Sequence, residues 1–195
     1  MAKKQKLVVA VVGSGRHAGN SDVLCDRALA GARAAGAKTK KFYLGDMKIT
    51  PCSGCDFCQR TREGLCAVHD DMEELYPLLR ACDALVVATP IYFFTMSAQT
   101  KLFIDRLYPL TTPEGMQLGE KRAVVCMAYG APDPLLAGVG NAAHIFNDIF
   151  TFAGIPMSFV HASAWQKGDV RKNRVALKRA FELGKEAVSP VARKS

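Results

Sequence analysis

Short apolar runs alternate with amphipathic stretches along this chain, and the alternation limits the possible fold more than any other feature. The runs at residues 7–12, 84–89 and 123–128 contain almost no polar side chains, which is typical of strands covered on both faces. Between such runs, apolar residues recur at helical spacing, as at Leu24 and Ala28. Strands joined by helices in this order predict a doubly wound α/β fold, with a five-stranded parallel sheet and helices on both faces.

The same pattern predicts bounds for each element. We expect strands at residues 7–12, 40–44, 84–89, 123–128 and 155–161. We expect one helix from Asn20 or Ser21 to Gly36, and others at 70–82, 97–107, 139–153 and 171–188. Pro90 should end the third strand, and Pro77 should kink the second helix or delay its start, because proline lacks the N–H group.

Residues 45–70 follow neither period. They are rich in Cys, Gly, Asp and Arg, and loops of this length in a compact domain are usually functional. The length of 195 residues suits one folding unit. We therefore expect a single domain over 1–195 with a cysteine-rich loop at 45–70.

Charge and hydropathy exclude some classes of partner. The net charge is +8, and many basic residues lie near the end of the chain, at Lys167, Arg171, Lys172, Arg174, Lys178, Arg179, Lys185, Arg193 and Lys194. No nucleic-acid motif accompanies them, and the single Trp165 offers no row of stacking aromatics, so we expect no nucleic-acid partner. The apolar run at 7–12 is shorter than a signal sequence core or a membrane span, so we expect a cytoplasmic protein without a membrane partner.

The loop at 13–21 has the composition of an anion site. It follows a buried strand and opens a helix, where free N–H groups and the helix dipole favour a phosphate. Gly13, Gly15 and Gly19 permit close approach, Ser14 and Ser21 offer hydroxyl groups, and Arg16 offers a charge. A tight turn without a ligand is one alternative. A dinucleotide loop is another, with Lys38, Lys40 and Lys41 in place of the usual acidic residue.

Two further loops follow strand ends and should meet the first loop at the same edge of the sheet. The segment Pro90-Ile91-Tyr92-Phe93-Phe94 offers aromatic side chains on which a flat ring could lie. Tyr129 and Gly130 begin a comparable turn after the fourth strand. An aromatic stripe of this kind is also common in protein cores.

These segments together resemble the NADPH-dependent FMN reductases and the iron–sulfur flavoproteins. The resemblance lies in Gly13-Ser14-x-Arg16-x-x-Gly19-Asn20-Ser21, Asp70-Asp71-Met72, Pro90-x-Tyr92 and Lys101-x-Phe103-Ile104-Asp105-Arg106. It implies a flavodoxin-like fold, FMN as cofactor, reduction by NAD(P)H, and a homo-oligomer. The FMN phosphate would bind at Ser14, Arg16, Gly19, Asn20 and Ser21. The ring would bind at Pro90, Ile91, Tyr92 and Phe93, with Tyr129 and Gly130 beside it.

Four of the seven cysteines are closely spaced, at Cys52, Cys55, Cys58 and Cys66. In a reducing compartment such spacing indicates metal or redox chemistry rather than disulfides. The spacing resembles the cysteine motif that holds a [4Fe-4S] cluster in iron–sulfur flavoproteins. An empty or oxidised site and a zinc site are the alternatives.

The favoured hypothesis is an enzyme, an NAD(P)H-dependent FMN oxidoreductase. Electrons would pass from the nicotinamide through FMN to a quinone, an Fe–S cluster or a redox protein. One alternative is an electron-transfer iron–sulfur flavoprotein without its own NAD(P)H oxidation activity. Another is a zinc-stapled protein that binds a ligand without redox chemistry. No side chain is assigned to acid–base catalysis.

Overall fold

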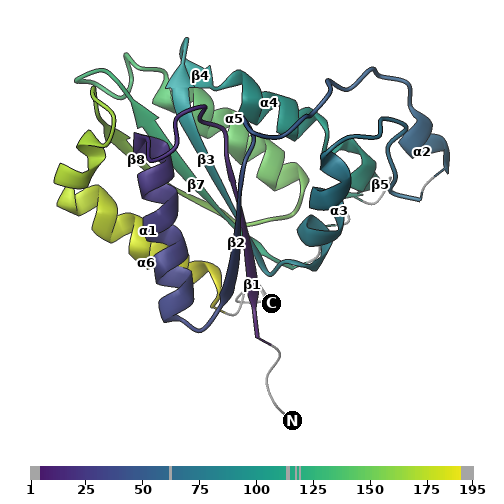
Figure 1. Cartoon of the computed structure of the whole chain (residues 1–195), viewed down its shortest axis with the longest axis horizontal. Helices are drawn as coiled ribbons and strands as arrows, with labels where there is room; N and C mark the ends of the chain where they lie inside the picture. The colour runs from purple at the N-terminus through teal and green to yellow at the C-terminus, as the bar shows by residue number, and fades with distance from the viewer. Residues whose placement is uncertain (1–4, 62, 113–114, 117, 119, 190–195) are drawn as a thin grey trace.

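A parallel sheet of five strands forms the centre of the protein (Figure 1). The computed structural model describes residues 5–61, 63–112, 115–116, 118 and 120–189. The strand order is β2-β1-β3-β7-β8, and each neighbouring pair along it is parallel. These strands are β1 (Leu7–Val12), β2 (Lys38–Tyr43), β3 (Ala84–Tyr92), β7 (Arg122–Tyr129) and β8 (Met157–Ser163). The predicted α/β fold with its five-stranded parallel sheet is confirmed.

Helices cover both faces of the sheet. Figure 1 shows α1 and α6 on one side and α3, α4 and α5 on the other. Their bounds are α1 (Asn20–Ala34), α3 (Met72–Ala81), α4 (Ala98–Asp105), α5 (Val139–Phe152) and α6 (Arg174–Ala187). Along β1, Val8, Ala10 and Val12 pack in the core under α1 and α6, whereas Val9 and Val11 pack in the opposite core. Burial on both faces explains why this strand has no polar residue.

Short elements complete the described chain. A two-residue strand, β4 (Thr95–Met96), folds back antiparallel on the end of β3. A separate two-stranded antiparallel sheet consists of β5 (Thr111–Thr112) and β6 (Gly115–Met116). Two 3-10 turns are η1 (Tyr108–Leu110) and η2 (Asp169–Lys172). The remaining helix, α2 (Phe57–Thr61), lies inside the cysteine-rich loop, where the sequence predicted no regular structure.

Several predicted bounds were wrong by a few residues. The strands predicted at 40–44 and 155–161 run at 38–43 and 157–163. The helix predicted at 97–107 runs at 98–105, and the 3-10 turn η1 follows it at 108–110. The helix predicted at 171–188 is divided into the 3-10 turn η2 at 169–172 and the α-helix at 174–187. The first helix has Gly19 as its N-cap, so Asn20 and Ser21 lie in its first turn and do not cap it.

Pro90 does not end its strand as predicted, and Pro77 does not delay the start of its helix, whereas a kink at Pro77 stays a prediction. The third helix begins at Met72 and contains Pro77, so its start is not delayed. The third strand continues through Pro90 to Tyr92. The carbonyl of Ala88 accepts a hydrogen bond from Gly13 and therefore faces β1, and the nitrogen of Pro90 faces the same side. Because β1 ends at Val12, no ladder bond is lost there.

Among the described residues, none of the helices combines the length and the apolar character needed to cross a membrane. The basic residues Arg193 and Lys194 lie outside the described part of the chain.

Candidate functional site

One cavity of about 240 Å³ lies where β1, β3, β7 and β8 end. Strand order reverses between β1 and β3, and open α/β sheets bind their ligands outside the strand ends at such a point. The cavity is lined by Ser14, Arg16, Gly19, Asn20, Ser21, Pro90, Ile91, Tyr92, Ala128, Tyr129, Gly130, Ala164, Trp165 and Lys167. Every residue predicted to bind the cofactor is therefore present, with the exception of Phe93.

The loop from Ser14 to Gly19 is a compact turn at the start of α1. The Ser14 hydroxyl accepts a hydrogen bond from the Arg16 N–H (3.1 Å), and the Gly19 N–H donates to the Arg16 carbonyl (3.0 Å). A Cβ on Gly19 would lie 2.8 Å from the Arg16 carbonyl oxygen, so the turn excludes larger residues here. The turn holds the first N–H groups of a 15-residue helix against the cavity, which favours an anion.

A buried carboxylate supports this turn from behind. Asp22 accepts hydrogen bonds from the Ala18 N–H (2.7 Å) and from the Tyr43 hydroxyl (3.0 Å). Lys41 donates to Asp22 at 2.9 Å and to Asp26 at 2.6 Å. Burial acts to lower the pKa of Lys41, but these hydrogen bonds outweigh it and raise the pKa above its usual value. Lys41 is thus a cation that balances the Asp22 charge beside the Ser14–Gly19 turn.

Buried hydroxyl groups connect the first loop to the third strand. The Ser97 hydroxyl donates to the Gly13 carbonyl (2.6 Å), and the Ser97 N–H donates to the Thr89 hydroxyl (3.0 Å). The Ser97 and Thr100 hydroxyls share a further bond of 2.9 Å at the N-terminus of α4. All three side chains are fully buried, so the network fixes the spacing between the Ser14–Gly19 turn and the segment of β3 that contains Pro90.

The turn between β3 and β4 has an unusual backbone. Phe93 and Phe94 both have positive φ angles, of 44° and 69°, which bulky residues rarely adopt. Phe93 is 97% exposed and does not line the cavity, whereas Tyr92 does. Such strain usually persists where the surroundings enforce it. Here Gly138, the N-cap of α5, packs against the Phe94 backbone.

We expect Gly138→Ala to destabilise the protein by about 2 kcal/mol or more and to weaken ligand binding in the cavity. Gly138 has a φ of +83°, and its Cβ would lie 2.3 Å from the Cα and carbonyl oxygen of Phe94. The Phe93–Phe94 turn would have to move. Urea unfolding measures the loss of stability.

The matched control is Gly140→Ala, two residues along the same helix. A Cβ there meets only the side chain of Leu135 at 3.9 Å, so stability should be unchanged or slightly higher. Equal stability of the two variants would contradict the assigned role of Gly138.

The four spaced cysteines share a second, smaller cavity of about 20 Å³. Cys52, Cys55, Cys58 and Cys66 all line it, together with Arg106. Hydrogen bonds from the Phe57 backbone and from Ser53 lower the pKa of Cys55, while burial raises that of Cys58. Within the described ranges, no three His, Cys, Asp or Glu side chains are arranged around one metal-ion position. The structure thus brings the four thiols together without defining a single-ion site.

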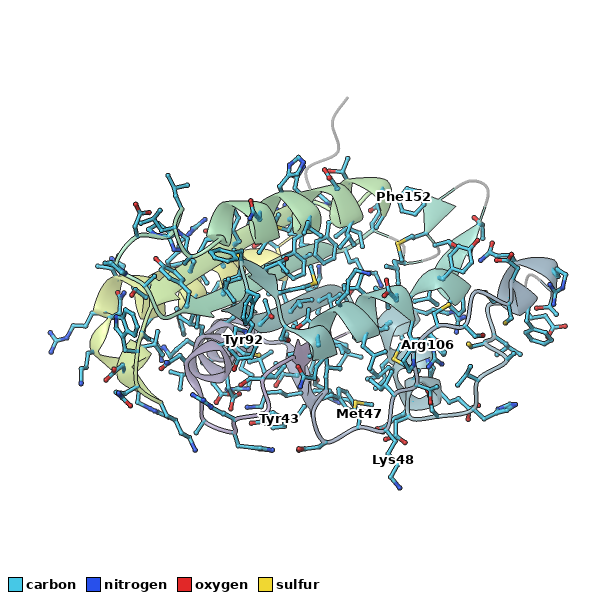
Figure 2. All side chains as sticks on the ribbon, turned by 90° about the horizontal axis from the view of Figure 1, so that it is seen from above. Tyr43, Met47, Lys48, Tyr92, Arg106 and Phe152 are labelled. Atoms are coloured by element: carbon cyan, nitrogen blue, oxygen red, sulfur yellow. The ribbon has the colours of Figure 1, made fainter. Side chains whose placement is uncertain are left out.

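Arg106 fastens both ends of the cysteine-rich loop. Its guanidinium donates to the Thr50 carbonyl (2.6 Å) and the Val68 carbonyl (3.4 Å), and forms two bonds to the Asp70 carboxylate (2.5 and 3.1 Å). Figure 2 shows Arg106 among the packed side chains, whereas Lys48 at the start of the loop points outward. Burial acts to raise the pKa of Asp70, but hydrogen bonds from Arg106 and two backbone N–H groups outweigh it and lower the pKa.

Sequence reasoning missed the loop that follows β8. Ala164, Trp165 and Lys167 line the first cavity, although Trp165 was considered only as a nucleic-acid contact and Lys167 only as part of a basic surface. The signal was available, because this loop also follows the carboxyl end of a parallel strand.

Comparison with known proteins agrees with the predicted family and fold. A model of the NADPH-dependent FMN reductase family matches residues 7–167. An iron–sulfur flavoprotein of Methanocaldococcus jannaschii is 30% identical over 190 residues, which cover 94% of this chain and 96% of that protein. The solved structure of a Trp repressor binding protein from Bacillus subtilis has a TM-score of 0.67 at 29% identity, and covers 90% of this chain and 98% of its own.

A structure of the NAD(P)H:quinone oxidoreductase from Methanothermobacter marburgensis has a TM-score of 0.78. It covers 96% of this chain and 100% of its own at 18% identity. This likeness supports the flavodoxin-like fold. The matched range includes the Ser14–Gly19 turn, the cysteine-rich loop and the segment around Pro90. This chain therefore belongs to the NADPH-dependent FMN reductase family.

Proposed function

We propose that this protein binds FMN in the first cavity and oxidises NAD(P)H with it, passing the electrons to a separate acceptor. One observation carries the proposal. A single cavity joins a helix N-terminus and an exposed Arg16 to a wall formed by Pro90, Ile91 and Tyr92. The first part suits a phosphate, and the second suits a flat ring.

The chain's own residues would bind the phosphate at the turn before α1. Ser14 and Ser21 are almost fully buried and line the cavity, and Arg16 makes no ion pair within the described residues. The carboxylate of Asp22 already has Lys41 as its counter-ion. An incoming phosphate would thus meet N–H groups, hydroxyls and an uncompensated cation.

The ring would lie between the ends of β3 and β7. Pro90 pairs with Ala128 in the sheet, so these two walls are held by the sheet itself. The Tyr129 hydroxyl shares a hydrogen bond of 3.3 Å with His161, which orients this wall. FMN supplies the hydride-accepting and electron-donating chemistry when bound, and the protein positions it and limits access of water.

We further propose that Cys52, Cys55, Cys58 and Cys66 hold an iron–sulfur cluster that acts as one acceptor. The donor set of four thiols lining one cavity suits such a cluster. The relative from Methanocaldococcus jannaschii is named an iron–sulfur flavoprotein. A quinone is the second acceptor proposed, in line with the name of the structurally similar oxidoreductase.

Arg16→Ala should weaken FMN binding at least tenfold, since a charge-assisted hydrogen bond contributes roughly 1.5–3 kcal/mol. Riboflavin has the same ring without the phosphate, so its affinity should change little. Titration of flavin fluorescence with both ligands measures the two effects. Equal FMN affinity in the variant and the native protein would contradict the phosphate assignment.

Anaerobic stopped-flow mixing of the FMN-loaded protein with NADPH or NADH tests the activity. Rapid loss of the oxidised-flavin absorbance with either nucleotide is expected. Slow reduction by both would favour the electron carrier over the enzyme. A protein that stays colourless after incubation with excess FMN would overturn the whole proposal.

A further inference from the structure

The loop after β8, residues 164–170, forms one wall of the first cavity, although it contains no recognised sequence motif. Ala164, Trp165 and Lys167 face the same cavity as Ser14 and Arg16. Their strand, β8, is at the edge of the sheet and is separated from β1 by β3 and β7, yet the loop after it reaches the N-terminal end of α1, where Asn20 bonds its backbone. The loop is thus placed to contact the phosphate end of a ligand.

Asn20 connects this loop to α1. Its amide Nδ2 donates to the carbonyls of Gln166 (2.9 Å) and Ala164 (3.4 Å), and its Oδ1 accepts from the Val170 N–H (3.2 Å). Both ends of the amide are therefore engaged by the backbone of the loop. Asn20 positions the loop against the helix N-terminus, in addition to lining the cavity.

The loop is also ordered from within. The Asp169 carboxylate accepts from the Gln166 N–H (2.8 Å), and the Asp169 N–H donates back to the Gln166 carbonyl (3.1 Å). Gly168 has a φ of +84°, which completes this tight turn. Asp169 pairs with Lys172 at 2.9 Å, whereas Lys167 makes no ion pair within the described residues.

The charged side chains that line the cavity are all positive among the described residues. Arg16 and Lys167 come from two different loops, and both line the cavity without a counter-ion among the described residues. No carboxylate is among the described residues that line it. Two uncompensated cations beside a helix N-terminus favour a phosphate dianion over an uncharged group.

We propose that Lys167, positioned by Asn20, is a second phosphate-binding cation that sets the preference of this site for FMN over riboflavin. This inference rests on the proposed function. A phosphate could come from FMN or from the 2′-phosphate of NADPH, and we assign Lys167 to FMN because it faces the turn before α1 across one cavity.

The test measures the affinities of the purified protein for FMN and riboflavin. Lys167→Met should weaken FMN binding about fivefold at low salt and leave riboflavin binding within about twofold, and the difference should shrink at high salt. Lys167→Arg should restore FMN binding. Lys178→Met, the same charge change at an exposed position of α6, should alter neither affinity.

A double-mutant cycle tests the role of Asn20. In an Asn20→Ala background, Lys167→Met should change FMN affinity less than about twofold, because the lysine is no longer held in place. An equal effect in both backgrounds would overturn the positioning role. Unchanged FMN affinity in Lys167→Met would overturn the proposal, as would a rise in KM for NADPH alone. If the native protein binds neither flavin, the proposed function itself fails, so the two failures are distinguishable.

Discussion

Replacing Arg106 with leucine should lower the free energy of unfolding by about 3–5 kcal/mol. Arg106 and Asp70 are only 1% and 6% exposed, and the guanidinium is the counter-ion of the carboxylate. Leucine would fill much of the same space but leave the buried Asp70 carboxylate without its counter-ion, with only the Thr50 and Met72 N–H groups as partners among the described residues. The Thr50 and Val68 carbonyls would also lose their donor. Urea unfolding followed by circular dichroism measures the change.

The loss should depend on pH. The native pKa of Asp70 lies below its unfolded value of about 3.9, so the ion pair stabilises the native protein above that pH and less as the pH falls through the native pKa. Without Arg106, burial should raise the pKa of Asp70. As the pH falls, protonation of Asp70 should then remove its buried charge and reduce the loss of stability in the variant. The difference in stability between the two proteins should therefore be largest near pH 7 and shrink towards pH 4.

Two further variants make the result specific. Adding Asp70→Asn to the leucine variant removes the unpaired charge and should recover much of the lost stability. Lys101→Met breaks an exposed pair with Asp105 on the neighbouring helix α4 and should change stability by less than about 0.5 kcal/mol. A leucine variant as stable as Lys101→Met would show that the Arg106–Asp70 pair does not hold the loop.

The sheet could be predicted because its strands are buried on both faces. The bounds of β1 were predicted correctly from its apolar run alone. The edge strand β2 was misplaced by two residues at its start, since Lys38, Lys40 and Lys41 interrupt its period. Pro90 was misread because the effect of a proline depends on where the neighbouring strand ends, which is a property of the sheet.

The place of Ser14, Arg16 and Ser21 at the cavity was predictable because they are close in sequence. Ser14 and Arg16 lie on the short loop after β1 and Ser21 lies in the first turn of α1, and the rule for strand ends places this segment. Lys167 was not predictable in the same way, since it is brought to the cavity by Asn20, 147 positions earlier in the chain and bonded to the backbone of its loop. Phe93 was expected beside a ring, but the positive φ turn directs it away from the cavity.

The single domain, the homo-oligomer and the cytoplasmic location stay predictions.

Changing Cys55 to serine should remove the iron from protein prepared without oxygen, while FMN stays bound. An iron–sulfur cluster needs its thiolate ligands, and Cys55 is the central residue of the Cys52-x₂-Cys55-x₂-Cys58 run. The cavity of the cysteines and the cavity proposed for FMN share no lining residue. Iron and acid-labile sulfide per FMN, with the visible absorption spectrum, measure the outcome.

A cysteine outside the cavity provides the control, and two other outcomes would contradict the prediction. Cys25 is fully buried in α1, away from the cysteine cavity, so Cys25→Ala should keep both iron and FMN. Four thiols also suit a zinc ion, so zinc in place of iron in the native protein would contradict the proposed iron–sulfur cluster. Loss of FMN together with iron in the serine variant would mean that the cysteine-rich loop shapes the flavin site. Arg106 and Asp70, which fasten that loop, would then support both sites at once.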